Sequence, residues 1–328
     1  MKKSTITSTT IATTAIALTI GIALTGCIGS AISALEGPPK PKVYVSDALI
    51  EKDADHTWEV TDQASFAAAA NGINNAGDGK KHIVNVKNSF STPNSPYTAA
   101  FYLTATNIAV VLEGNATISF SPAGRTTNLL EVSNGQAIIV RDIKLQGHSN
   151  STESLVKVRA GGKFIMEGSA SVSGNTARGS SKKRAAGACS NKTYPGGVYV
   201  TGGAFIMKDN SSVSGNTSSG EDCHGRGFGS GGGVELGVEV VSVGTFSSIS
   251  GTFTMQDNAS VTGNSALEYG GGVYVSAGTF IMKDNSAVSG NTAGTGGGVY
   301  GRVTIQDNAK VSGNTARTGV GSDVQGKP

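Results

Sequence analysis

The sequence predicts an all-β fold, a parallel β-helix of about eight coils that begins with a short capping helix. Three observations predict it. The C-terminal half contains five copies of one sequence unit, the last two copies are 23 residues apart, and apolar residues alternate with polar ones inside each copy. A repeat of this length is too short for a pair of helices and fits one turn of a coil made of short strands.

Each copy opens with an apolar triplet and closes eleven residues later with an asparagine that follows Ser-Gly or Thr-Gly. The triplets begin at Phe164, Phe205, Phe253, Phe280 and Val303, and the asparagines are Asn175, Asn216, Asn264, Asn291 and Asn314. Apolar residues two apart have the period of a strand. We therefore expect stacked coils to bury columns of Phe, Met and Val over one another.

The turns between strands carry a second pattern. Asp209, Asp257, Asp284 and Asp307 share a column with Gly168. An exchange of Asp with Gly at one position predicts a backbone with positive φ. The glycine before each repeat asparagine predicts a second tight corner, and the asparagines themselves predict a structural ladder of stacked amides.

Upstream of the clean repeats, weaker strand patterns predict about three degenerate coils. The candidate strands are Tyr102–Ala105, Ile108–Leu112, Ala116–Phe120, Leu129–Val132, Ala137–Lys144 and Leu155–Val158. A solenoid needs a cap over its first coil. We assign that role to residues 56–100, with a helix over Asp62–Ala76 that places Phe66, Ala70 and Ile73 on one face, and a strand over His82–Val86. The β-helix is then expected over 101–328, with the tail from Ala316 closing its far end.

The N-terminus has the form of an export signal. Lys2 and Lys3 precede an apolar stretch, Ile16–Leu24, that is too short to span a membrane. The stretch ends in Leu24-Thr25-Gly26-Cys27, which resembles the bacterial lipobox. The resemblance implies that residues 1–26 are a signal peptide and that Cys27 is acylated, for instance with palmitate. The alternative is an ordinary signal peptide with an incidental cysteine.

Residues 27–55 contain three prolines and no sustained periodicity, so we expect a lipidated tether. Ile28 follows the lipidation site in place of the Asp associated with inner-membrane retention, which favours the outer membrane or cell surface. The lipid would make the membrane a partner of this chain.

The repeats over residues 155–316 resemble those of bacterial surface proteins of the polymorphic outer-membrane type. The shared features are the recurrent Gly-Gly-Val and the Phe-containing units. The resemblance implies a right-handed β-helix. This chain departs from the short signature Phe-x-x-Asn of those proteins, because its units read Phe-Ile-Met-Lys-Asp-Asn.

Composition and motifs argue against several function classes. A formal charge of +3 over 328 residues does not favour nucleic acid, and the four histidines (56, 82, 148 and 224) have no metal-ligand spacing. We predict no cofactor. Parallel β-helices include polysaccharide lyases and hydrolases, which need clustered carboxylates. Here most acidic residues of the coils belong to the turn column, and Arg141–Lys144 resembles a lyase strand over only four residues. We therefore predict a non-enzymatic adhesion, interaction or scaffold module, with a glycan-active enzyme as the alternative.

Two insertions fall at the same place in successive coils, residues 176–195 and 217–230, and should be neighbours in space. They form a candidate surface for a host or matrix protein or a glycan, although both could simply be solvated. Its charged residues are Arg178, Lys182, Lys183, Arg184, Glu221, Asp222, His224 and Arg226. Cys189 and Cys223 are predicted to form a disulfide, because an exported protein meets oxidising conditions. The alternative is two free thiols. A third insertion, Val238–Ser250, is expected to form a hairpin.

Tyr199, Tyr274 and Tyr300 are expected to share an outward column that Glu235 interrupts. Aligned surface aromatics can bind sugar rings, and this column is a candidate aromatic platform. The competing interpretation is ordinary packing between strands.

Overall fold

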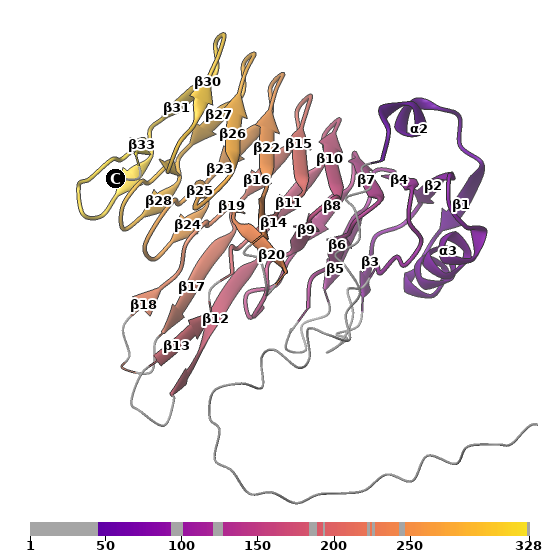
Figure 1. Ribbon diagram of the computed structural model, residues 1–328, viewed down its shortest axis with the longest axis horizontal. Helices are drawn as coiled ribbons and strands as arrows, with labels where there is room; N and C mark the ends of the chain where they lie inside the picture. The colour runs from indigo at the N-terminus through magenta and orange to yellow at the C-terminus, as the bar shows by residue number, and fades with distance from the viewer. Residues whose placement is uncertain are drawn as a thin grey trace, which may run out of the picture. The chain divides into compact units, whose positions relative to one another are not determined.

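The computed structural model describes residues 45–92, 101–120, 127–183, 189–192, 194–221, 224, 227–242 and 247–326. Its short strands stack coil upon coil, as Figure 1 shows, in four parallel sheets that run along one axis. The fold is a right-handed parallel β-helix, as the repeats predict.

Sheet 1 has nine strands. In spatial order they are β1 (His56–Val60), β2 (Lys81–Val86), β4 (Ile108–Glu113), β7 (Gln136–Arg141), β10 (Lys163–Glu167), β15 (Ala204–Met207), β22 (Thr252–Met255), β26 (Thr279–Met282) and β30 (Thr304–Ile305). Sheet 2 contains β3 (Phe90–Thr92), β5 (Thr117–Phe120), β8 (Lys144–Gln146), β11 (Ser171–Ser173), β16 (Ser212–Ser214), β23 (Ser260–Thr262), β27 (Ala287–Ser289) and β31 (Lys310–Ser312). Each coil contributes one strand to sheet 2, so its eight strands among the described residues confirm the expected eight coils.

Sheets 3 and 4 complete the coils. Sheet 3 contains β6 (Leu130–Val132), β9 (Val156–Arg159), β14 (Val198–Thr201), β19 (Val234–Leu236), β25 (Val273–Val275), β29 (Val299–Tyr300) and β33 (Val324–Gln325). Sheet 4 contains β12 (Thr176–Lys183), β17 (Thr217–Glu221), β24 (Ser265–Ala266), β28 (Thr292–Ala293) and β32 (Thr315–Ala316), with β13 (Cys189–Lys192) and β18 (Gly227–Phe228) added antiparallel. The third insertion is the predicted hairpin, formed by β20 (Val238–Ser242) and β21 (Ser247–Ser250).

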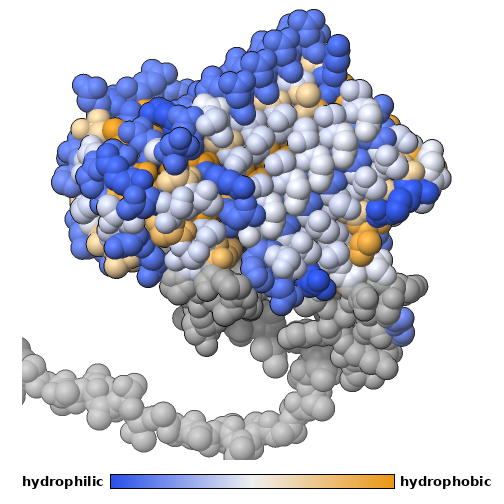
Figure 2. Space-filling view, turned by 180° about the vertical axis from the view of Figure 1, so that it is seen from behind, coloured by the Kyte–Doolittle hydropathy of each residue, from blue (hydrophilic) through white to orange (hydrophobic). Residues whose placement is uncertain are grey.

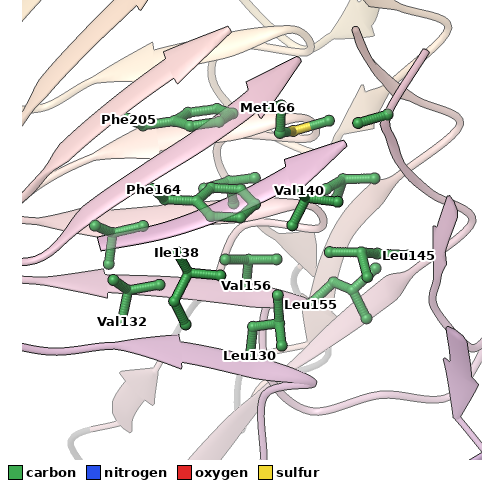
Figure 3. Close-up of a cluster of buried hydrophobic side chains, with 14 of the residues drawn as sticks. Leu130, Val132, Ile138, Val140, Leu145, Leu155, Val156, Phe164, Met166 and Phe205 are labelled. Carbon is green, nitrogen blue, oxygen red and sulfur yellow. The ribbon is translucent and has the colours of Figure 1, made fainter. Parts of the chain in front are cut away.

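The core consists of aligned columns of apolar side chains. Phe164, Phe205, Phe253 and Phe280 are all buried, and successive rings stack with centroids 4.7–5.2 Å apart. The column continues into the degenerate coils, where Ile138 lies in register with Phe164. Figure 3 shows this transition, with aliphatic side chains such as Ile138 and Val140 packed beneath Phe164 and Met166. The upstream coils therefore keep the core while they lose the consensus.

A buried amide ladder joins the five regular coils, as predicted. From Asn216 to Asn314, the Oδ1 of each repeat asparagine accepts the backbone N–H of the asparagine one coil earlier, at 2.9–3.1 Å. From Asn216 onward, each Nδ2 also donates to the next side chain in the ladder. Asp323 takes the place of a sixth asparagine and accepts both bonds from Asn314.

The turn column behaves as its Asp/Gly exchange predicts. Asp209, Asp257, Asp284 and Asp307 have φ of 54–57°, and Gly168 has φ of 63°. In this column, the Oδ2 of each aspartate accepts the backbone N–H of the preceding coil. These carboxylates are therefore part of the scaffold.

From behind, Figure 2 shows a hydrophilic ridge along one edge of the stacked coils, beside a broad surface of intermediate hydropathy, as small Ser and Thr side chains produce.

The N-terminal cap is α3 (Gln63–Ala76), within the predicted helix. Asp62 is its N-cap and forms a capping box with Ser65. The ring of Phe66 packs against Phe90 and Phe101, with centroids 5.1 and 4.6 Å apart. The helix thus places its apolar face on the first coils, which closes the N-terminal end of the core.

The first coil begins earlier than expected. We expected the β-helix from residue 101, but β2 and β3 already pair in register with β4 and β5. Tyr102–Ala105, expected to be a strand, forms none. The side chain of Asn74 bonds the N–H of Thr104 at 2.7 Å and the carbonyl of Tyr102 at 3.3 Å, and Gln136 bonds two further carbonyls of this segment. Side chains therefore replace the strand ladder here.

The end of the expected tether is folded onto sheet 1. Residues Asp47–Glu51 form a short helix, α2, and Val45 and Leu49 pack on the outer apolar side chains of that sheet, including Val111, Ile139 and Ile165. Lys163 holds the helix by an ion pair of 2.8 Å with Asp47. The isolated apolar residues of this segment gave no periodicity, because they contact an outer sheet face and not a helix partner.

The C-terminal end differs from the capped N-terminal end. The tail contributes β33, which completes the eighth coil beside β29. In the last coil Ile305, from the Met column, is 45% exposed. Across the described tail, no helix covers this end as α3 covers the other.

The ladder predicts the effect of one substitution. In Asn264→Ala, the backbone and side-chain N–H groups of Asn216 lose a buried acceptor, so we expect the unfolding free energy to fall by about 2 kcal/mol. Urea unfolding followed by circular dichroism measures it. Asn258→Ala is the matched control, because Asn258 lies on the exposed corner of the same coil. Equal losses from the two variants would contradict a stabilising role for the buried ladder.

Candidate interaction surfaces

The first two insertions together form one sheet. Strands β12 and β17 pair in parallel from Thr176 with Thr217 to Gly179 with Gly220, and β13 and β18 fold back antiparallel on either side. We call these four strands the insert sheet. Figure 1 shows them extending well beyond the shorter strands β24 and β28 of the same sheet. The prediction that the two insertions are neighbours is therefore confirmed.

The coil geometry explains why the insertions continue as strands. β12 and β17 begin at the corner after the repeat asparagines, where the ladder has already aligned them. Phe228, at the end of β18, is buried against Gly220, where a Cβ would come within 2.9 Å of the Phe228 ring. A glycine at this position thus allows β18 to fold back onto β17.

Most of the predicted charged residues lie on or beside this sheet. Arg178 is exposed in β12, Lys182 and Lys183 pair with Ser190 and Cys189, Glu221 ends β17, and His224 is exposed. Arg184, Asp222, Cys223 and Arg226 lie outside the described residues, as does Cys27. The disulfide between Cys189 and Cys223 therefore stays a prediction.

The tyrosine column lies on the outer face of sheet 3. Tyr199, Glu235, Tyr274 and Tyr300 follow one another in register across β14, β19, β25 and β29. A further tyrosine, Tyr269, joins them from the corner before β25, with its ring centroid 4.6 Å from that of Tyr300 and 6.1 Å from that of Tyr274. Tyr194 approaches Tyr199 in the same way, at 6.2 Å.

Sequence reasoning missed Tyr269 and Tyr194 because neither lies in a repeat strand. Both precede a Gly-Gly element by one or two residues. Tyr269 is held by isolated bridges to Ser230 and Thr295 of the adjoining coils. The common position of the two tyrosines before Gly-Gly is the signal that could have found them.

Glu235 is the unusual member of the column. Its neighbours Val234 and Leu236 belong to the core, so its own side chain points outward, yet it is only 8% exposed. Its Oε2 is buried and has no hydrogen-bond partner. Burial raises the pKa of this carboxyl to about 8 and also raises the pKa of Tyr274. The folded protein therefore holds a protonated carboxyl at neutral pH.

The residues that resembled a lyase strand have structural partners. Arg141 bonds Glu113 at 2.7 Å and Glu167 at 2.6 Å, one coil to each side. Asp142 occupies the turn column with φ of 57° and accepts the N–H of Ser169. Within the described ranges no group of three or more His, Cys, Asp or Glu side chains could hold a metal ion, and no helix is long and apolar enough to cross a membrane.

Glu235 predicts a pH dependence of stability. The unfolded chain loses this proton near pH 4.5 and the folded chain near pH 8, so the folded state binds one proton more in between. Its contribution to stability is complete below pH 4.5 and is lost as the pH rises toward about 8. We expect Glu235→Gln to remove a slope of roughly 1.4 kcal/mol per pH unit in this window.

Urea unfolding of the wild-type chain and the variant at several pH values measures the difference. Burial lowers the pKa of His82, whose contribution has the opposite sign, but His82 is present in both proteins and cancels. Glu268→Gln is the control for loss of a carboxyl near the tyrosines. Parallel stability curves for the wild-type chain and Glu235→Gln would contradict the prediction.

Comparison with protein-family models, with curated proteins and with solved structures finds no match to this chain.

Proposed function

We propose that this chain is a lipid-anchored bacterial surface protein in which the β-helix is a non-enzymatic scaffold and the insert sheet binds a partner. The observation that carries the proposal is the pairing of β12 with β17, which joins loops from two coils into one surface. Charged residues of both insertions belong to these strands, while the turn aspartates and repeat asparagines of the coils bond one another.

The partner is a matrix protein or an acidic glycan. The described cationic residues of the insert sheet include Arg178, Lys182 and Lys183, all on β12. Arg178 lies in the part of β12 that pairs with β17, and Lys182 and Lys183 lie in the part that pairs with β13. The backbone that carries the three cations is therefore a hydrogen-bonded strand and needs little ordering on binding. An extended anionic chain could follow such a strand and contact several cations at once.

The lipid anchor supports display of this surface. The lipobox resemblance at Leu24–Cys27 supplies the attachment, and two or more acyl chains hold a protein stably at a membrane. Outer-membrane or cell-surface location follows from the same proposal.

Charge reversal tests the binding surface. We expect the triple variant Arg178→Glu, Lys182→Glu, Lys183→Glu to lose roughly tenfold or more of its binding to acidic glycans or matrix proteins on an array, because complementary charge attracts the ligand. The control reverses three exposed cations of the coils, Lys144, Arg302 and Lys310, with the same change in net charge. Equal losses from both variants would exclude the insert sheet as the binding surface. Cleavage of an acidic polysaccharide by the wild-type chain would overturn the non-enzymatic assignment.

Lipidation is tested separately. We expect the full-length protein expressed in a bacterial host to partition into the detergent-rich phase of Triton X-114, and Cys27→Ser to move it to the aqueous phase, because the acyl chains supply the apolar anchor. Immunoblotting of both phases measures the partition. Detergent-phase recovery of Cys27→Ser would show that the cysteine is not the anchor.

A further inference from the structure

Apart from Glu235, the described outward-facing glutamates on sheets 1 and 3 have cationic partners nearby. Arg141 lies between Glu113 and Glu167 on sheet 1, and Arg159 pairs with Glu131 on sheet 3. Glu235 occupies the same column of sheet 3 as Glu131, three strands along. It has no cation, although it is the most deeply buried of these carboxyls.

The neighbours of Glu235 in its column are aromatic. Tyr199 and Tyr274 stand in register on the strands to either side. Two glycines allow this packing: a Cβ at Gly231 would come within 2.8 Å of the Glu235 Cβ, and one at Gly237 within 3.2 Å of the Tyr199 ring. Carboxyl and rings are thereby held close together in a setting from which water is largely excluded.

One residue of the same column indicates which kind of group can lie beside these tyrosines. The Nζ of Lys157 lies 6.0 Å from the centroid of the Tyr199 ring, on the strand before it. A lysine ammonium therefore already stands near one tyrosine of the column. On the other side of Tyr199 the carboxyl of Glu235 has no ammonium beside it, and it becomes a counter-charge when it loses its proton.

We propose that Glu235, Tyr199 and Tyr274, with Tyr269 and Tyr300 at the rim, bind the ammonium group of a lysine side chain from a partner polypeptide. Tyrosine faces attract a cation through the ring quadrupole, and the attraction is greatest where water is excluded. A carboxylate adds a charge-assisted hydrogen bond. A neutral hydroxyl gains neither term, so a sugar without an amine fits this site less well. Tyr269 at the rim is 37% exposed, so a partner can reach its ring from solvent.

Binding requires one proton to leave. Burial raises the pKa of Glu235 to about 8, so the empty site holds a carboxylic acid at neutral pH. When the ammonium binds, the carboxyl O–H proton passes to solvent and a carboxylate–ammonium pair remains. Among the described residues, Tyr199 and Tyr274 stand beside Glu235 in register. Burial raises the pKa of Tyr274, so that phenol keeps its proton at neutral pH, and Glu268 lies near Tyr274. The site is separate from the insert sheet, and its test does not depend on the proposed function.

Isothermal titration calorimetry tests the site with the folded chain. The probe is a Gly-Lys-Gly peptide with blocked termini, titrated at pH 7 in two buffers of different ionisation enthalpy. We expect saturable binding with release of close to one proton, and no binding of the same peptide with an acetylated lysine. Glu235→Gln should weaken binding by about tenfold or more and abolish proton release. Glu268→Gln should keep both.

Tyr274→Leu and Tyr274→Phe separate the aromatic contribution from folding. The leucine variant should weaken binding and the phenylalanine variant should restore it, while circular dichroism shows that all variants remain folded. The proposal is overturned if the free-lysine peptide does not bind, if the acetylated peptide binds equally, or if Glu235→Gln binds as the wild-type chain does. Tighter binding of a glucosamine oligomer than of the lysine peptide would overturn the assignment to a polypeptide partner.

Discussion

In-register stacking of equivalent residues is the constraint on which the rest of this structure depends. The buried ladder from Asn175 to Asn314 imposes it, because each amide bonds the backbone of the preceding coil and a shift of one residue would leave several polar groups unpaired in the core. Once the asparagines are aligned, the phenylalanine column and the turn aspartates are aligned as well. Asp323 ends the ladder with an acceptor, so the last asparagine is also satisfied.

Stacking in register also determines where non-repeated residues lie. An insertion made at the same corner of two successive coils emerges beside its counterpart, which is why β12 and β17 pair although their asparagines are 41 residues apart in sequence. The same rule brings Tyr274 and Tyr300 together and places Glu235 between tyrosines. In a solenoid of this kind, the position of a residue within the repeat determines where on the surface that residue lies.

This rule explains how much could be predicted from the sequence. Residues at the same position of successive repeats must lie in register on successive coils. The coils, the ladder, the positive-φ turns and the tyrosine column could therefore be predicted from the sequence. Segments outside the repeat have no equivalent positions in other coils, so their register cannot be predicted in this way. Tyr102–Ala105 has a strand-like pattern, but its backbone groups form hydrogen bonds with the side chain of Asn74, about 30 residues earlier in the chain. Helix α2 is five residues long, and Tyr269 meets Tyr300 only through the corner geometry. Their positions depend on tertiary contacts that no local period reports.

The buried asparagine and turn-aspartate columns differ from the outward column of sheet 3, and this difference indicates which surface can bind a ligand. A scaffold column tolerates little change, since every member must satisfy the coil on each side. The outward column of sheet 3 does not follow that pattern, because the type of side chain changes along it, from Lys157 through Tyr199 and Glu235 to Tyr274. Burying a carboxyl there without a partner costs stability at neutral pH, whereas Gln at this position would avoid ionisation and an aromatic residue would continue the column. Such a loss of stability from an unpaired buried group is characteristic of binding sites, where the ligand provides the missing interaction partner.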